Sequence, residues 1–369
     1  MIQYIFIFFI LLIVIFVSRR KPLWANSSKS NKIGLVLCLS LLCAMSALKG
    51  STVGNDTHEY LRLFEMGEDA LWANTRYEVG YLYFSQIVWK VFHKPQALFI
   101  VYSLIFYIAL WHFIWKYSSM PWLSVLIFFA YTLFGFSMSA LRQSLAIAIL
   151  FVGFDFAIKK KYVLFAVTVF AASLFHSSAI FFSFSPLILR LKPSKKTIFL
   201  FIGSTFIASL LFGDILETIF SYLPYYSHYQ EGVYFEGGVR LASILQLLLA
   251  ILFLYVGYHS YVRLPKGYSF SDKEFLGHLV VMQMMAVALS ILCLKVNILD
   301  RIVLYYSTFV LLLIPNAIVL MPYRKRRIFG IMVLAVVFLH TLIILTLRPE
   351  WNSVYPYCFY WEELTPINY

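Results

Sequence analysis

Two residues that could carry chemistry interrupt a long apolar stretch between Gly135 and Pro186. Arg142 lies near its start and His176 far along it, with the lysines 159–161 between them. A charged side chain at the centre of a membrane segment costs roughly 2.5–3.5 kcal/mol on insertion scales, so such residues mark candidate functional sites. A guanidinium matches phosphate oxygens in bidentate fashion, and an imidazole can relay protons near neutral pH. The alternatives are an arginine that satisfies backbone carbonyls and a buried structural histidine.

Two acidic residues are further candidates. Asp56 lies in the polar loop after the second apolar run, and its spacing to Glu59 is that of a capping box at the start of a short helix. The two alternative roles of Asp56 are therefore a helix cap and a functional carboxylate. Glu78 begins another apolar segment, where a carboxylate is costly unless it is paired. Arg76, two residues earlier, is its nearest possible partner.

A third group of candidates lies late in the chain. Arg301 starts an apolar run directly after Asp300, and Tyr305 lies one helical turn further along the same face. Simple neutralisation of Arg301 by Asp300 is the alternative to a functional role. Arg240 precedes another apolar run, where an ordinary interfacial arginine is the alternative.

The composition is that of a helical membrane protein. The chain has 369 residues, of which 62% are hydrophobic and 13% charged, whereas soluble domains are about one quarter charged. The net charge of +13 resides largely in short basic blocks between apolar runs, which are topology signals and argue against nucleic-acid binding. The four cysteines form no CxxC pair, and no His or Cys spacing predicts a metal site. We therefore expect no cofactor.

The apolar runs predict an all-α polytopic bundle of about twelve transmembrane helices in one integral-membrane domain, residues 1–369. The predicted spans are Ile2–Val17, Ile33–Lys49, Ala97–Trp115, Trp122–Phe136, Ala140–Ile158, Tyr162–Phe175, Ser177–Leu189, Thr197–Phe212, Leu241–Ser260, Phe275–Leu294, Ile302–Leu320 and Ile328–Leu347. Val79–Phe92 is short and carries polar residues, so we expect it to be a re-entrant or interfacial segment.

The lysines 159–161 determine the predicted topology. Basic residues flank spans on the cytoplasmic side. To keep this block there, Val79–Phe92 must not cross the membrane, and Tyr162–Leu189 must form two short helices that meet at His176. Two helices of about 14 residues each reach only about 21 Å, so the tip of this hairpin would be recessed below the outer surface.

This topology places the candidate residues on one side of the membrane. Both termini lie outside, with external loops at about 50–77 and 213–239 and an external tail at 348–369. Arg142, His176 and Arg301 then lie at the outer ends of their spans. The second loop and the tail are rich in tyrosine, mixed with acidic residues that can accept hydrogen bonds from sugar hydroxyls.

Short motifs along the chain, taken in order, carry a family resemblance. They are Asn55-Asp56-x-x-x-Tyr60, Glu78-Val79-Gly80-Tyr81, Leu141-Arg142-Gln143-Ser144-Leu145-Ala146, Phe175-His176-Ser177-Ser178-Ala179, Asp300-Arg301 with Tyr305-Tyr306, and Tyr355-Pro356-Tyr357. In this order the chain resembles the EpsG-like family of Wzy-type polysaccharide polymerases, which make O-antigen or exopolysaccharide.

The resemblance implies a GT-C-like multi-span bundle in the bacterial cytoplasmic (inner) membrane, with its active site facing the periplasm or exterior. It implies a glycosyltransferase that moves a glycan from undecaprenyl diphosphate to the non-reducing end of a new lipid-linked repeat unit. The implied partners are the lipid-linked donor and acceptor, the lipid bilayer, a chain-length regulator and a flippase. A ligase that uses another acceptor and a flippase or transporter of the lipid-linked oligosaccharide are the alternatives.

The candidate residues take expected roles in that chemistry. The departing diphosphate needs cations, and four arginines could supply them: Arg142, Arg301, Arg76 and Arg240. The acceptor hydroxyl needs a general base, and three residues are candidates: Glu78, His176 and Asp56. Three tyrosines in the same motifs are expected to contact sugar: Tyr60, Tyr81 and Tyr305.

Cysteine labelling tests the topology. In intact cells, with the native cysteines replaced, we expect Ser177→Cys to react with a membrane-impermeant maleimide. Lys160→Cys should react only after the membrane is permeabilised, because the lysine block is predicted to be cytoplasmic. Labelling of position 160 from outside would overturn the topology, and with it the shared outer face of the candidate residues.

Overall fold

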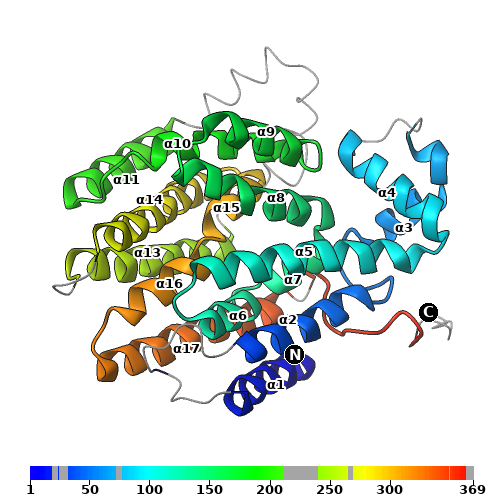
Figure 1. Ribbon diagram of the computed structural model, residues 1–369, viewed down its shortest axis with the longest axis horizontal. Coiled ribbons are helices and arrows are strands. Elements are labelled where there is room, and N and C mark those ends of the chain that lie inside the picture. Colours follow the sequence, from blue (N-terminus) through cyan, green and yellow to red (C-terminus); the bar gives the residue numbers. More distant parts are fainter. Residues whose placement is uncertain are drawn as a thin grey trace. The chain divides into compact units, whose positions relative to one another are not determined.

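A computed structural model describes residues 1–18, 24, 32–71, 77–211, 240–264, 269–348 and 350–362. Within these ranges the chain is all-helical, and the one β-type pairing is an isolated bridge between Lys49 and Phe359 (Figure 1). The chain divides into two compact units. One comprises Met1–Ser183 with Pro322–Tyr369, and the other comprises Phe184–Met321.

The first unit contains helices that follow the apolar runs of the sequence. They are α1 (Ile2–Val17), α2 (Lys32–Ala47), α3 (Thr57–Glu65), α4 (Val79–Phe92), α5 (Pro95–Tyr117), α6 (Pro121–Ala130), α7 (Leu133–Ser139), α8 (Leu141–Ile158), α9 (Tyr162–Ser173) and α17 (Tyr323–Leu347), with the 3₁₀ helices η1 (Gly67–Leu71) and η2 (Ser177–Phe184). Helix α5 packs against α2 and α8, and α8 packs against α9 (Figure 1). Helix α6 contacts α1, α2 and α17.

The second unit is a smaller helical assembly. Its helices are α10 (Ser185–Ile188), α11 (Lys195–Leu210), α13 (Leu241–Val262), α14 (Phe270–Cys293), α15 (Asp300–Ser307) and α16 (Val310–Val319), with the 3₁₀ turn η4 (Asn297–Leu299). Helix α14 lies at its centre, because it contacts α10, α11, α13, α15 and α16.

The apolar helices agree with a membrane protein. In the described part of the chain, five helices are long and apolar enough to cross a membrane, and up to seven if each of two bent helix pairs is one span. The five are α5, α8, α13, α14 and α17, and each coincides with a predicted span. The other predicted spans coincide with shorter helices, so the twelve-span topology stays a prediction.

Two of the predicted spans are not continuous helices. Trp122–Phe136 breaks into α6 and α7 with a bend of 62°, and Ile302–Leu320 breaks into α15 and α16 with a bend of 45°. At the first break Thr132 adopts a left-handed backbone with φ of 62°. The Thr341 hydroxyl of α17 donates a hydrogen bond to the Ala130 carbonyl, which the break leaves without a helical partner.

The predicted break at His176 is confirmed, and the membrane-spanning hairpin around it stays a prediction. Helix α9 ends at Ser173, and η2 begins at Ser177 after a three-residue turn. The N-terminal end of α4 packs on this turn, where the Gly80 N–H donates to the Leu174 carbonyl at 2.9 Å. Helix α4 has 14 residues, and its re-entrant or interfacial position stays a prediction.

The C-terminal tail packs on the start of the chain. The Gln3 side chain exchanges two hydrogen bonds with the backbone of Tyr357, of 3.0 and 2.7 Å. The Tyr357 hydroxyl donates to the Met45 carbonyl in the last turn of α2 at 2.7 Å. The loop after α2 bonds the tail as well, since the Gly50 and Gly54 N–H groups donate to tail carbonyls. Residues 353–360 are therefore part of the first unit's structure.

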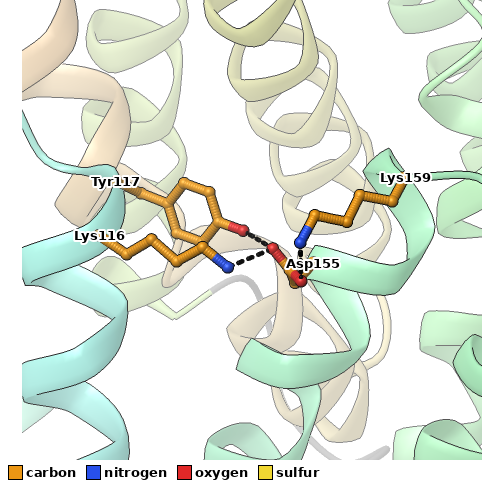
Figure 2. Close-up of polar contacts among 4 residues, drawn as sticks. All are labelled: Lys116, Tyr117, Asp155 and Lys159. Carbon is orange, nitrogen blue, oxygen red and sulfur yellow. Dashed lines mark hydrogen bonds and ion pairs between the residues drawn. The ribbon is translucent and has the colours of Figure 1, made fainter.

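A polar cluster joins the ends of α5 and α8 at Asp155 (Figure 2). Its Oδ1 accepts from Lys116 Nζ at 2.5 Å and from the Tyr117 hydroxyl, and its Oδ2 pairs with Lys159 Nζ at 2.7 Å. The Asp155 side chain is 16% exposed, whereas those of Lys116 and Lys159 are 36% and 51% exposed. Asp155 thus fixes α8 against α5 at the end of α8 opposite Arg142.

We expect Asp155→Asn to lower the free energy of unfolding by about 1 kcal/mol, because a neutral amide loses the charge-assisted bonds while the lysines remain partly solvated. The matched control is Glu350→Gln, whose pair with Arg348 is 62% and 55% exposed, with an expected change within about 0.5 kcal/mol. Thermal unfolding in detergent measures both. Equal midpoints for the two variants would contradict the role assigned to Asp155.

Candidate functional site

A carboxylate and a guanidinium meet at the starts of two helices in the first unit. Glu78 is the N-cap residue of α4, and Arg142 lies in the first turn of α8. Glu78 Oε2 forms an ion pair with Arg142 Nη1, and Glu78 Oε1 accepts a hydrogen bond of 2.9 Å from the Ser177 backbone N–H. The carboxylate makes no cap bond to its own helix. It therefore joins α4, α8 and the turn after α9.

The Glu78–Arg142 pair is largely withdrawn from solvent, with side chains 16% and 13% exposed. Burial acts to raise the pKa of the Glu78 carboxyl, but the Arg142 charge and the Ser177 N–H oppose it and hold that pKa below its ordinary value. The carboxylate is therefore ionised at neutral pH. Because folding lowers this pKa, the resulting stabilisation is present above the ordinary Glu range and is lost as pH falls through the lowered pKa.

Three tyrosine rings lie around Arg142. Its Cζ is 4.2 Å from the centroid of the Tyr77 ring, a cation–π distance. Tyr60 of α3 and Tyr81 of α4 lie 5.4 Å apart between ring centroids, and Tyr77 lies 6.4 and 6.2 Å from them. Tyr60 and Tyr81 are buried, at 1% and 0% exposure. Their predicted contact with sugar stays a prediction, since in this structure they pack beside the guanidinium.

Arg142 retains hydrogen-bonding capacity in this arrangement. Its Nε is buried and has no hydrogen-bond partner among the described residues. An unpaired buried donor costs about 1–3 kcal/mol, so an anionic oxygen that reached it would be bound favourably. In the same described part of the chain, no group of three His, Cys, Asp or Glu side chains could hold a metal ion. The site therefore offers a cation, a carboxylate and aromatic rings.

His176 lies at the tip of the hairpin beside this pair. Its side chain is buried at 6% exposure, and its Nδ1 lies 2.7 Å from the Ser178 hydroxyl. The His176 charge contributes to lowering the pKa of Glu78, after the larger effects of Arg142 and the Ser177 N–H. The structure thus brings the two predicted bases, Glu78 and His176, to one place.

Asp56 lies directly before α3, which begins at Thr57 as expected. The predicted capping box is wrong, because the Asp56 side chain makes no cap bond and Glu59 instead pairs with Arg62 at 2.6 Å. The i,i+3 spacing favours that pair on the exposed side of the helix. Asp56 Oδ2 lies 3.4 Å from the Tyr60 hydroxyl, so the carboxylate adjoins the tyrosines around Arg142.

Three predicted site residues belong to the second unit. Arg240 is the N-cap residue of α13, and its charge acts on the carboxyl of Asp300 at the start of α15. Arg301 is exposed, and Tyr305 is buried at 2% exposure. Their shared face with Arg142 stays a prediction. Arg76 and the tyrosine-rich loop at 213–239 lie outside the described residues.

Sequence reasoning missed two contributors to the site. Tyr77 stands directly before Glu78, and an aromatic ring next to a costly carboxylate was an available signal. The Ser177 N–H could not have been found in this way, because a backbone donor is independent of residue type. Its role depends on the close approach of α4 to the hairpin turn.

Comparison with known proteins agrees with the motifs in the sequence. A family model described as the EpsG family matches residues 31–359. Searches of curated proteins and of solved structures found no match. All of the candidate site residues, from Asp56 to Tyr305, fall within the matched range.

Gly80 allows the close approach that positions Glu78. A Cβ at this residue would lie 2.6 Å from the Leu174 carbonyl oxygen and 2.8 Å from Leu174 Cβ. Because the first of these is backbone, we expect Gly80→Ala to push α4 away from the turn and destabilise the protein by about 1–3 kcal/mol.

Thermal unfolding in detergent measures this effect. The control is Gly203→Ala in α11, where a Cβ would have nothing within 4 Å. That variant should keep or slightly raise the unfolding midpoint, because alanine favours helix. An unchanged midpoint for Gly80→Ala would show that α4 and the turn are not held at this distance.

Proposed function

The chain belongs to the EpsG family, and from this membership we propose that it is a polysaccharide polymerase of the membrane. It would transfer a glycan from a lipid diphosphate, undecaprenyl diphosphate, to the non-reducing end of a new lipid-linked repeat unit. The observation that carries this proposal is the Glu78–Arg142 pair beside His176, because it combines a cation for a leaving diphosphate with candidate bases for an acceptor hydroxyl.

The proposed transfer needs no cofactor. The acceptor hydroxyl oxygen bonds to the anomeric carbon of the donor glycan, and the bond from that carbon to the diphosphate oxygen breaks. The hydroxyl proton passes to the general base, and the lipid diphosphate leaves with its electron pair. Since the donor already carries a good leaving group, neither a nucleotide sugar nor ATP enters the reaction.

Arg142 is the residue we assign to the leaving diphosphate. Its Nε, which has no hydrogen-bond partner among the residues that the structure describes, can take a phosphate oxygen, and guanidinium forms bidentate bonds with phosphate. Diphosphate binding would compete with Glu78 for the guanidinium. A Glu78 carboxylate that loses this partner becomes more basic, because the charge that lowers its pKa is then shared with the phosphate.

Glu78 and His176 are the nearest candidates for the base, and Asp56 would orient the sugar. Arg301, Arg76 and Arg240 are further candidates for the diphosphate, and the buried Tyr305 for sugar. These assignments rest on the motifs and on charge.

We further propose a setting for this site. The protein would lie in the bacterial cytoplasmic membrane as a GT-C-like bundle of about twelve spans, with the Glu78–Arg142 pair at the outer face. The basic block at 159–161 supports this orientation. The lipid-linked donor and acceptor, the bilayer, a flippase and a chain-length regulator would be its partners.

Reconstitution with a lipid-linked repeat unit tests the reaction. A ladder of products that differ by one repeat unit is the expected result. A single addition to a different acceptor would indicate a ligase, and movement of the lipid-linked unit across vesicles without new bonds would indicate a flippase. Either outcome would overturn the polymerase proposal.

In the same assay we expect Arg142→Lys to lower the rate of polymer formation about 100-fold, because the ammonium keeps the charge but loses the bidentate fork. The control is Arg348→Lys, because Arg348 pairs with the exposed Glu350, and its rate should stay within about twofold of wild type. Full-length polymer from Arg142→Lys at the wild-type rate would contradict the assignment of Arg142 to the diphosphate.

A further inference from the structure

A buried lysine lies beside the site but outside every role assigned above. Lys49 follows the end of α2 by two residues and is 1% exposed. Its Nζ donates hydrogen bonds to the Val53 carbonyl at 3.1 Å, to Thr57 Oγ1 at 2.7 Å and to the Met138 carbonyl at 2.5 Å. It also lies 4.6 Å from the centroid of the Phe99 ring. Lysines are almost never fully buried without such partners.

Burial lowers the pKa of the Lys49 amine to about 7, against the opposing effect of the Asp56 charge, and the contacts of this amine suit its protonated form. The Thr57 hydroxyl donates its own hydrogen to the Val53 carbonyl at 2.5 Å, so it must accept from Nζ. All three partners of Nζ are then acceptors, and only an ammonium group has three hydrogens to donate to them. Because each hydrogen is used and the group is buried, Lys49 has no donor left for a substrate.

Lys49 connects two segments that carry site residues. On one side, Thr57 opens α3, with Asp56 directly before it and Tyr60 one turn later. On the other side, Met138 lies in the last turn of α7, four residues before Arg142.

Other contacts in the same place strengthen this connection. The Asn55 N–H donates to the Ser139 hydroxyl at 3.0 Å. Gly54 has a φ of 98°, and a Cβ there would lie 2.7 Å from the Met138 carbonyl oxygen. The loop therefore lies directly against the corner between α7 and α8, and Lys49 supplies its buried charged contact.

We propose that Lys49 is a positioning residue of the polymerase site: its ammonium ties the start of α3 to the end of α7 and thereby sets Asp56 and Tyr60 at a fixed distance from Arg142. This inference rests on the proposed function. Glu78 and the Tyr77 ring hold Arg142 independently of Lys49, and Glu78 is itself fixed by the Ser177 N–H. Loss of Lys49 should therefore disturb alignment of the acceptor side more than binding of the diphosphate.

The test compares turnover with binding in the full-length protein reconstituted in nanodiscs. Undecaprenyl diphosphate is the binding probe, and it gives both the affinity and the number of sites per protein. We expect Lys49→Met to keep the number of sites and an affinity within about threefold of wild type. Its turnover of lipid-linked repeat units should fall about 10- to 100-fold, the size of effect that a small misplacement of reacting groups produces.

Two Thr57 variants provide a second measurement with less disturbance of packing. Thr57→Val keeps the shape but removes the acceptor for Lys49, so its turnover should fall in the same direction. Thr57→Ser keeps the hydroxyl and should retain turnover near wild type. The matched control is Lys94→Met, since Lys94 is exposed at the start of α5, and its turnover should not change.

Each outcome bears on one proposal. If the wild-type protein makes no ladder of products, the polymerase proposal fails, and this failure is independent of the role of Lys49. If wild type makes a ladder and both Lys49→Met and Thr57→Val match its turnover, the positioning role is overturned. It is equally overturned if turnover falls only in proportion to the number of binding sites, because Lys49 would then serve folding alone.

Discussion

The ion pair between Glu78 and Arg142 is the interaction on which the site depends. Two opposite charges in an apolar bundle offset their desolvation only when geometry is good and further hydrogen bonds satisfy most of their remaining polar atoms. The Ser177 N–H donates a hydrogen bond to the second oxygen of the Glu78 carboxylate, and the Arg142 guanidinium lies over the Tyr77 ring. For this to occur, the first turns of α4 and α8 and the hairpin turn must be held together.

Helix ends inside the first unit make that arrangement possible. A continuous transmembrane helix satisfies its own backbone, whereas a broken one presents free carbonyls and N–H groups that side chains must satisfy. The Thr341 hydroxyl donates a hydrogen bond to the Ala130 carbonyl, and Lys49 Nζ donates one to the Met138 carbonyl. The Glu78 carboxylate accepts one from the Ser177 N–H. Polar side chains in and near the site thus also satisfy backbone groups at the helix ends of this unit.

Much of this could be predicted from the sequence, because apolar runs and costly charges are local signals. The limits of α1, the helix break at His176 and the expectation that Glu78 needs a charged partner are examples. The break at Thr132 could not, since neither glycine nor proline marks it and the Thr341 hydroxyl that supports it lies 211 residues from Ala130. In the sequence Lys49 is only the last residue of a predicted span. Its structural role follows from the three acceptors around its Nζ, of which the Met138 carbonyl is far away in the sequence.

The tail contacts have a consequence for the order in which the protein is made. The loop that carries Asp56 donates two backbone hydrogen bonds to the carbonyls of Ser353 and Cys358, near the end of the chain. A ribosome adds residues in order, at about 5–20 per second, so the loop waits through the synthesis of some 300 further residues before these partners exist. The earliest part of the site is therefore completed by the last part of the chain, and a nascent or prematurely ended protein lacks those bonds.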